Sequence, residues 1–155
     1  MSLIALDSNI LVYLAGTAFV QADIPKIARV QALVGSLNSV ASLVAPVQAL
    51  GELFVVLKRA GADPMEARAI VNEYSQSFLP AASLPQTMAA AVDLVVEHKF
   101  QLWDALILTA ASQAGCTVLL SEDMQDGFVH RGLTIVNPLA EVPHPQLARL
   151  LDTQA

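Results

Sequence analysis

The chain alternates between short, continuously apolar runs and longer stretches in which apolar residues recur at helical spacing. Continuous apolar runs are typical of strands that helices cover on both faces. We predict strands at Leu3–Leu6, Val40–Ala45, Ala81–Leu84, Thr117–Leu120 and Leu133–Val136. Strands that alternate with helices pair in parallel through right-handed crossovers. The pattern therefore predicts an α/β fold, a three-layer α/β/α sandwich with a short, mainly parallel central sheet.

Capping and stop residues mark the ends of the predicted helices. Asp63 stands before Pro64 and three residues before Glu66, an arrangement that starts a helix and gives both acids a structural role. Glycines follow three of the helices and favour their termination. The predicted helices are Ser8 or Asn9 to Leu14, Asp23 to Leu37, Pro46 to about Gly61, Pro64 to Phe78, Pro85 to His98, Trp103 to Ala114, and Pro143 to Leu151. We expect one domain over residues 1–140, with 141–155 as a tail or short helix on the same domain.

Composition excludes several classes of protein. The chain has 155 residues, of which 55% are hydrophobic and only 14% charged, so it is not disordered. Its length fits one domain. No apolar run approaches the roughly 18 residues of a membrane-spanning helix, and the N-terminus lacks the basic segment of a signal peptide. The single cysteine, Cys116, fits a reducing compartment, so we expect a cytoplasmic protein.

Acidic residues cluster where a parallel sheet places its ligands. The net charge is −6, with 14 acids against 8 Lys and Arg. Asp7 ends the first strand and Asp123 follows the strand at 117–120, at the carboxyl ends where such sheets bind ligands. Glu52 and Asp104 lie inside apolar helices, where an unpaired charge is costly to bury. Carboxylates without a compensating base are typical of a site for Mg²⁺ or Mn²⁺.

Each of these acids also has an ordinary structural explanation. Asp7 could simply cap a helix, Asp104 could complement the dipole of a helix N-terminus, and Glu52 could face solvent. A shared metal site has the advantage that it explains all of the acids together.

Four segments in order resemble the motifs of PIN domains. They are Leu6-Asp7-Ser8-Asn9-Ile10, Leu50-Gly51-Glu52-Leu53, Trp103-Asp104-Ala105-Leu106-Ile107 and Leu120-Ser121-Glu122-Asp123, followed by the terminal strand and Asn137-Pro138. The pattern covers roughly residues 1–140, and its single-domain form is similar to that of the VapC type of toxin.

The resemblance implies a PIN-like fold and a Mg²⁺- or Mn²⁺-dependent endoribonuclease, the toxin of a toxin–antitoxin pair. Carried over by motif, the catalytic and metal-binding acids are Asp7, Glu52, Asp104 and Asp123, with Asn9 and Ser121 in support. The implied partners are an RNA substrate (tRNA or another structured RNA), a cognate antitoxin and a second copy of the chain in a homodimer, with no membrane.

Several alternatives stay open from the sequence. Glu122 or Asp126 could assist Asp123, although Asp126-Gly127 favours a turn. Trp103 is expected to be a packing residue rather than a base-stacking platform. A catalytically silent PIN-like module that acts through its antitoxin or RNA partner is the alternative function, although such a module would be expected to lose one or more of the four acids.

Overall fold

The structure is a computed structural model that describes residues 1–152. Six strands form one sheet in the order β3-β2-β1-β4-β6-β5. Every neighbouring pair is parallel except β5 with β6, which is antiparallel. The strands are β1 (Ser2–Leu6), β2 (Ala41–Pro46), β3 (Leu79–Ala81), β4 (Val118–Leu120), β5 (Val129–His130) and β6 (Leu133–Val136).

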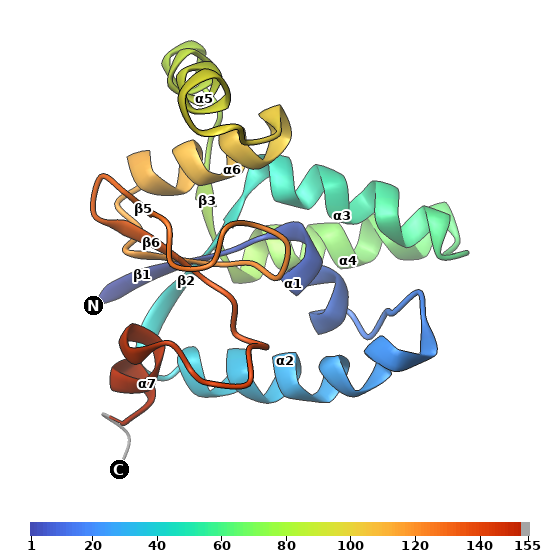
Figure 1. Ribbon diagram of the computed structural model, residues 1–155. Coiled ribbons are helices and arrows are strands. Elements are labelled where there is room, and N and C mark those ends of the chain that lie inside the picture. The colour runs from blue at the N-terminus through green and yellow to red at the C-terminus, as the bar shows by residue number, and fades with distance from the viewer. Residues whose placement is uncertain (153–155) are drawn as a thin grey trace.

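Helices cover both faces of this sheet, as the sandwich prediction requires (Figure 1). Helices α2 and α7 lie on one side of the sheet, while α6 lies on the other side with α5 packed outside it (Figure 1). The helices are α1 (Ser8–Leu14), α2 (Ile24–Leu37), α3 (Val47–Arg59), α4 (Pro64–Ser77), α5 (Pro85–His98), α6 (Leu102–Gln113) and α7 (Pro145–Asp152). A single 3₁₀ turn, Gln21–Asp23, precedes α2.

The central strands and α6 are almost wholly apolar because protein surrounds them. Ile4, Ala5 and Leu6 of β1 are fully buried, and so are the three residues of β4. In α6 the seven consecutive residues 105–111 are all buried, so this helix lacks a clear polar face. The high hydrophobic content of the chain therefore fills a covered sheet and an internal helix. No helix among residues 1–152 is long and apolar enough to cross a membrane.

Most element predictions are confirmed, and three need correction. The helix after β1 is capped by Asp7 itself rather than by Ser8 or Asn9. The strand expected at Ala81–Leu84 lies earlier, at Leu79–Ala81, because those residues pair with Val44–Pro46 of β2 and residue 84 already caps α5. The sequence analysis also missed β5, a two-residue strand that pairs with β6 through a tight turn at Gly132.

The C-terminal helix packs on the same domain. Leu147 of α7 is only 3% exposed, and α7 contacts α2. The last three residues of the predicted 141–155 segment lie outside the described part of the chain.

The strand order creates one point at which the chain changes direction across the sheet. From β1 it proceeds to β2 and β3 on one side, and then returns to β4 on the other side of β1. Ligands of open α/β sheets bind at such a switch point, beyond the carboxyl ends of the strands. The carboxyl ends of β1 and β4 are followed by Asp7 and by Ser121-Glu122-Asp123.

Candidate active site

Asp7 is the most constrained acid of the site. It is 2% exposed, and its backbone N–H donates to the carbonyl of Leu120 at 3.0 Å, which holds the ends of β1 and β4 together. Its Oδ1 accepts the backbone N–H of Ser8 at 2.7 Å and so caps α1. The capping role considered from the sequence is therefore real, and the same carboxylate faces the switch point.

Ser121 and Asn9 hold the second oxygen of this carboxylate. The Ser121 hydroxyl, which is fully buried, donates to Asp7 Oδ2 at 2.7 Å, and Asn9 Nδ2 donates to the same oxygen at 3.2 Å. Both residues also bind the loop after β4. Asn9 Oδ1 accepts the N–H of Glu122, and Ser121 Oγ accepts the N–H groups of Asp123 and Met124. These contacts fit the supporting roles predicted for Asn9 and Ser121.

Burial and hydrogen bonding act on Asp7 in opposite directions. The pKa of Asp7 is raised to about 7, first by burial and then by the charges of Asp104 and Glu52, although hydrogen bonds from Ser121 and Ser8 act to lower it. The hydrogen bonds that the carboxylate accepts from Ser8, Asn9 and Ser121 favour its ionised form. Within residues 1–152 no cation forms a salt bridge with Asp7.

Glu52 reaches the same site from α3. Its Oε2 accepts the Ser8 hydroxyl at 2.8 Å, and the same hydroxyl lies 3.4 Å from Asp7 Oδ1. Its Oε1 lies 3.4 Å from Gln48 Nε2. Ser8 therefore bridges the first two acids, and Glu52 is turned toward the site rather than toward bulk solvent.

Asp104 lies in the first turn of α6 and interacts with all three of the other acids. Its pKa is raised by burial first, and then by the charges of Glu52 and Asp123. It is also one of the charges that raise the pKa of Asp7. A helix N-terminus stabilises an acid, but three neighbouring acids act against that effect. Within residues 1–152 none of the four acids forms a salt bridge.

Glu122 and Asp126 do not join this group. Glu122 accepts the hydroxyl of Tyr13 at 2.7 Å and forms a salt bridge with Lys26 of α2. Asp126 accepts the backbone N–H of Asn137 at 2.9 Å, which agrees with the turn favoured by the sequence. Of the three acids after β4, Asp123 is thus the one that shares the electrostatic environment of Asp104.

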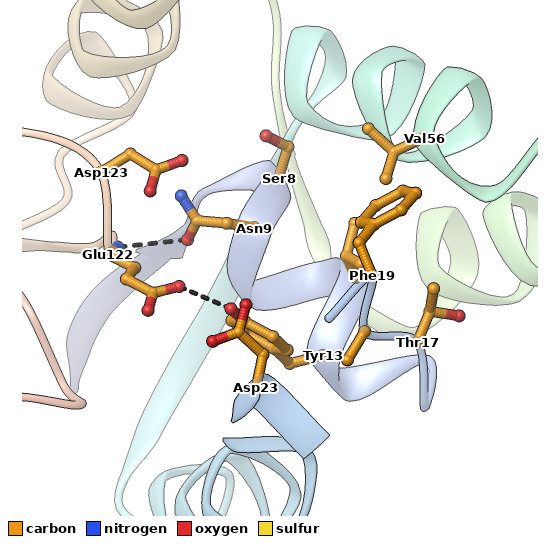
Figure 2. A pocket seen from close by; sticks show the side chains of 11 residues that line it. Ser8, Asn9, Tyr13, Thr17, Phe19, Asp23, Val56, Glu122 and Asp123 are labelled. Atoms are coloured by element: carbon orange, nitrogen blue, oxygen red, sulfur yellow. Dashed lines mark hydrogen bonds between the residues drawn. The ribbon is translucent and has the colours of Figure 1, made fainter. Parts of the chain in front are cut away.

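Two pockets flank the acids and meet at Val56. One, of about 410 Å³, has an apolar wall that includes Phe19 and a polar lining of Ser8, Asn9, Tyr13, Asp23, Glu122 and Asp123 (Figure 2). The other, of about 470 Å³, is lined by Glu52, Gln48, Gly51, Val55, Arg59 and Trp103. Trp103 is 53% exposed, so the expectation that it packs inside the protein is wrong.

The carboxylates are the right type of ligand for a hard divalent cation, but their side chains do not lie close enough together to coordinate one. Carboxylate oxygens are the ligands that Mg²⁺ and Mn²⁺ prefer, and unpaired acids with raised pKa values would gain from such a charge. Yet no three His, Cys, Asp or Glu side chains in the described chain are close enough to hold a metal ion together. Metal binding would therefore need adjustment of the side chains.

The sequence analysis missed two residues beside the site, Tyr13 and Lys26. Tyr13 lies one helical turn after Asn9 and shares its face of α1, which was an available signal. Lys26 lies 96 residues from Glu122 in the sequence, so no local pattern indicates their contact.

Comparison with solved structures finds the same architecture in toxin–antitoxin proteins. The Mycobacterium tuberculosis VapC20, a toxin that cleaves the sarcin–ricin loop, aligns with a TM-score of 0.59 at 18% identity over 75% of this chain and 86% of its own. VapBC2 from Rickettsia felis, bound to a promoter DNA fragment, aligns with a TM-score of 0.60 at 13% identity over 78% and 88%. A toxin–antitoxin complex from Klebsiella pneumoniae aligns with a TM-score of 0.60 at 18% identity over 89% and 98%.

Comparison at the level of sequence finds no relative of the chain. No family model matches the chain, and no curated protein matches it either. At identities below 20% the structural likeness establishes the fold. The chain has the PIN-like fold of the VapC toxins, as its four acidic motifs predicted.

Proposed function

We propose that this protein is a Mg²⁺- or Mn²⁺-dependent endoribonuclease, the toxin of a toxin–antitoxin pair. The observation that supports the proposal is that Asp104 interacts electrostatically with Asp7, Glu52 and Asp123. Within residues 1–152 none of these four acids forms a salt bridge. The likeness of the fold of this chain to that of a toxin that cleaves the sarcin–ricin loop supports RNA as the substrate.

The four acids would hold the cation, with Asp7 as its most rigid ligand. A bound divalent cation supplies positive charge to the phosphodiester and activates water for hydrolysis. Asp7 is already oriented by Ser8, Asn9 and Ser121, so its contribution costs little reorganisation. The 8 Lys and Arg of the chain form no dense basic run in the sequence.

Glu52 is suited to take a proton from the attacking water. Its Oε2 is occupied by the Ser8 hydroxyl at 2.8 Å, whereas Oε1 has only a long contact to Gln48 at 3.4 Å. We assign proton acceptance to Oε1, because a general base needs an oxygen that can turn toward the water. Ser8 keeps the other oxygen in place during this step.

The partners follow from the same assignment. We propose a cognate antitoxin that covers the acidic cleft, a homodimer formed through exposed apolar helix surface, and action in the cytoplasm. The exposed side chains of Val47 and Val55 on α3, and of Val92 and Val96 on α5, support an interface of some kind. Light scattering of the purified chain, alone and with its operon neighbour, tests both associations.

Cleavage of defined RNAs tests the activity. The protein is stripped of metal with EDTA, and end-labelled tRNA and a sarcin–ricin stem-loop are incubated with it in the presence or absence of MnCl₂. We expect cleavage at discrete sites only with Mn²⁺. Asp104→Asn should abolish cleavage, while Asp93→Asn, which removes an exposed aspartate on α5, should retain it.

Two results would overturn the assignment. Cleavage by Asp104→Asn at the wild-type rate would remove this acid from the chemistry. Absence of cleavage of any structured RNA by the wild-type protein, combined with tight binding of the operon neighbour, would favour the silent binding module instead.

A further inference from the structure

We propose that Glu122 is a positioning residue rather than a metal ligand: Tyr13 and Lys26 hold it, and it thereby holds Asp123 in the cleft. We call the contacts among Tyr13, Lys26 and Glu122 the Glu122 clamp. The proposal rests on the proposed nuclease function for its catalytic consequence, but its structural part is independent of that function.

The clamp connects three separate elements. The Tyr13 hydroxyl of α1 donates to Glu122 Oε2 at 2.7 Å. The Lys26 ammonium of α2 pairs with Glu122 Oε1 and also with Asp23 at 2.8 Å. The same ammonium lies 5.9 Å from the centre of the Tyr13 ring, so it contacts both other members of the clamp. Both oxygens of Glu122 are therefore engaged outside the group of four acids.

Glu122 and its neighbour Asp123 point in different directions. Figure 2 shows the Glu122 carboxylate extending toward Tyr13 and Asp23, while Asp123 lies on the other side of Asn9. The backbone between them is fixed as well, because the N–H of Glu122 donates to Asn9 at 3.2 Å and the N–H of Asp123 donates to Ser121 at 3.3 Å. Because its side chain and its N–H are both anchored, Glu122 fixes the backbone position from which the exposed side chain of Asp123 extends.

The clamp also limits repulsion at the site. Glu122 would add a fifth carboxylate to a group in which the charges of Glu52 and Asp123 already raise the pKa of Asp104. Pairing with Lys26 neutralises it, and Lys26 is the one cation that forms a salt bridge with any acid after β4 in residues 1–152. Of the adjacent acids Glu122 and Asp123, only Asp123 is thus left without a salt bridge among residues 1–152.

The test compares Glu122→Ala, Tyr13→Phe and Lys26→Met with the wild type and with Glu141→Gln, which removes an exposed glutamate far from the clamp in sequence. Kinetics with Mn²⁺ and labelled RNA should show kcat reduced about 10- to 100-fold in Glu122→Ala with KM changed less than about 2-fold, the range seen when residues that orient metal ligands are lost. Tyr13→Phe and Lys26→Met should show smaller losses of kcat. Tyr13→Phe should add nothing in the Glu122→Ala background, because the shared contact is already gone.

Hydrogen exchange gives a readout that does not depend on activity. In the metal-free protein the amides of residues 122–124 should exchange at least about 10-fold faster in Glu122→Ala, and also faster in Tyr13→Phe, while amides of β1 and β4 stay protected. If the wild-type protein cleaves no RNA, the proposed function fails and exchange alone decides whether the clamp exists.

Two outcomes would overturn the proposal. Unchanged exchange at residues 122–124 in both Glu122→Ala and Tyr13→Phe would show that the clamp does not hold the loop. Complete loss of cleavage in Glu122→Ala, with wild-type kcat in Tyr13→Phe and Lys26→Met, would show that Glu122 acts directly on the metal or the substrate.

Discussion

Replacing Ser121 by alanine removes one buried hydroxyl that makes three hydrogen bonds. It donates to Asp7 Oδ2 at 2.7 Å and accepts the N–H groups of Asp123 at 3.3 Å and Met124 at 3.2 Å. Because the side chain is fully buried, water cannot take over these contacts. Ser121→Ala should therefore destabilise the protein in a way that depends on the ionisation of Asp7.

The magnitude follows from the kinds of bond that are lost. A hydrogen bond to a charged group contributes about 1.5–3 kcal/mol, and a buried donor left without a partner costs about 1–3 kcal/mol. At pH 8, above the pKa of Asp7 of about 7, both losses apply, so we expect a decrease of about 3–5 kcal/mol in the free energy of unfolding. At pH 5 metal-free Asp7 is mostly neutral, and the decrease should be about 2 kcal/mol smaller.

Urea denaturation followed by circular dichroism, in EDTA at pH 8 and pH 5, measures this difference. Ser83→Ala is the matched control, because Ser83 is exposed before α5 and its loss should change stability by less than about 0.5 kcal/mol. A loss below about 1 kcal/mol at pH 8, or an equal loss at both pH values, would refute the role given to the Ser121 hydroxyl.

Four further predictions concern single features of the structure. The free energy of unfolding of the metal-free wild type should fall by up to about 4 kcal/mol as pH rises from about 4 to 7. The cause is the raised pKa of Asp7, because the folded protein keeps a proton on this carboxyl that the unfolded chain releases. A free energy of unfolding that rises over this range in EDTA would contradict the prediction. Asp104→Asn should raise the metal-free melting temperature in calorimetry, because it removes repulsion from Glu52 and Asp123, and added Mn²⁺ should reverse the ranking. Thr109→Val should raise the free energy of unfolding by about 1 kcal/mol in urea denaturation, since the buried Thr109 hydroxyl has no hydrogen-bond partner among residues 1–152. Trp103→Ala should raise KM for RNA several-fold with little change in melting temperature, because the exposed indole of Trp103 beside Glu52 offers a stacking surface for a base. An unchanged KM would show that Trp103 has no role in binding.

The sequence by itself determined the architecture and predicted the acids of the candidate site. The positions of β1, β2, β4 and β6 followed from continuous apolar runs, because a parallel sheet covered on both faces excludes polar residues from its strands. The start of α4 followed from Asp63, whose side chain accepts the N–H of Met65 at 2.8 Å. Asp104 stood out because it is the one charged residue in the largely apolar helix at 102–113, with no Lys or Arg within four residues. Such features depend only on residues a few positions apart, which is why a pattern can reveal them.

Only the tertiary structure decided which acid after β4 interacts with Asp104. The sequence left Glu122 and Asp126 as possible helpers of Asp123, and the contact of Lys26 with Glu122 spans 96 residues. That pairing depends on how α2 packs beside the loop after β4, which no local period encodes. The same holds for Trp103, expected inside the protein but left 53% exposed because the buried face of α6 begins two residues later. Charge pairing and exposure are set by distant elements that meet only when the sheet and its helices have assembled.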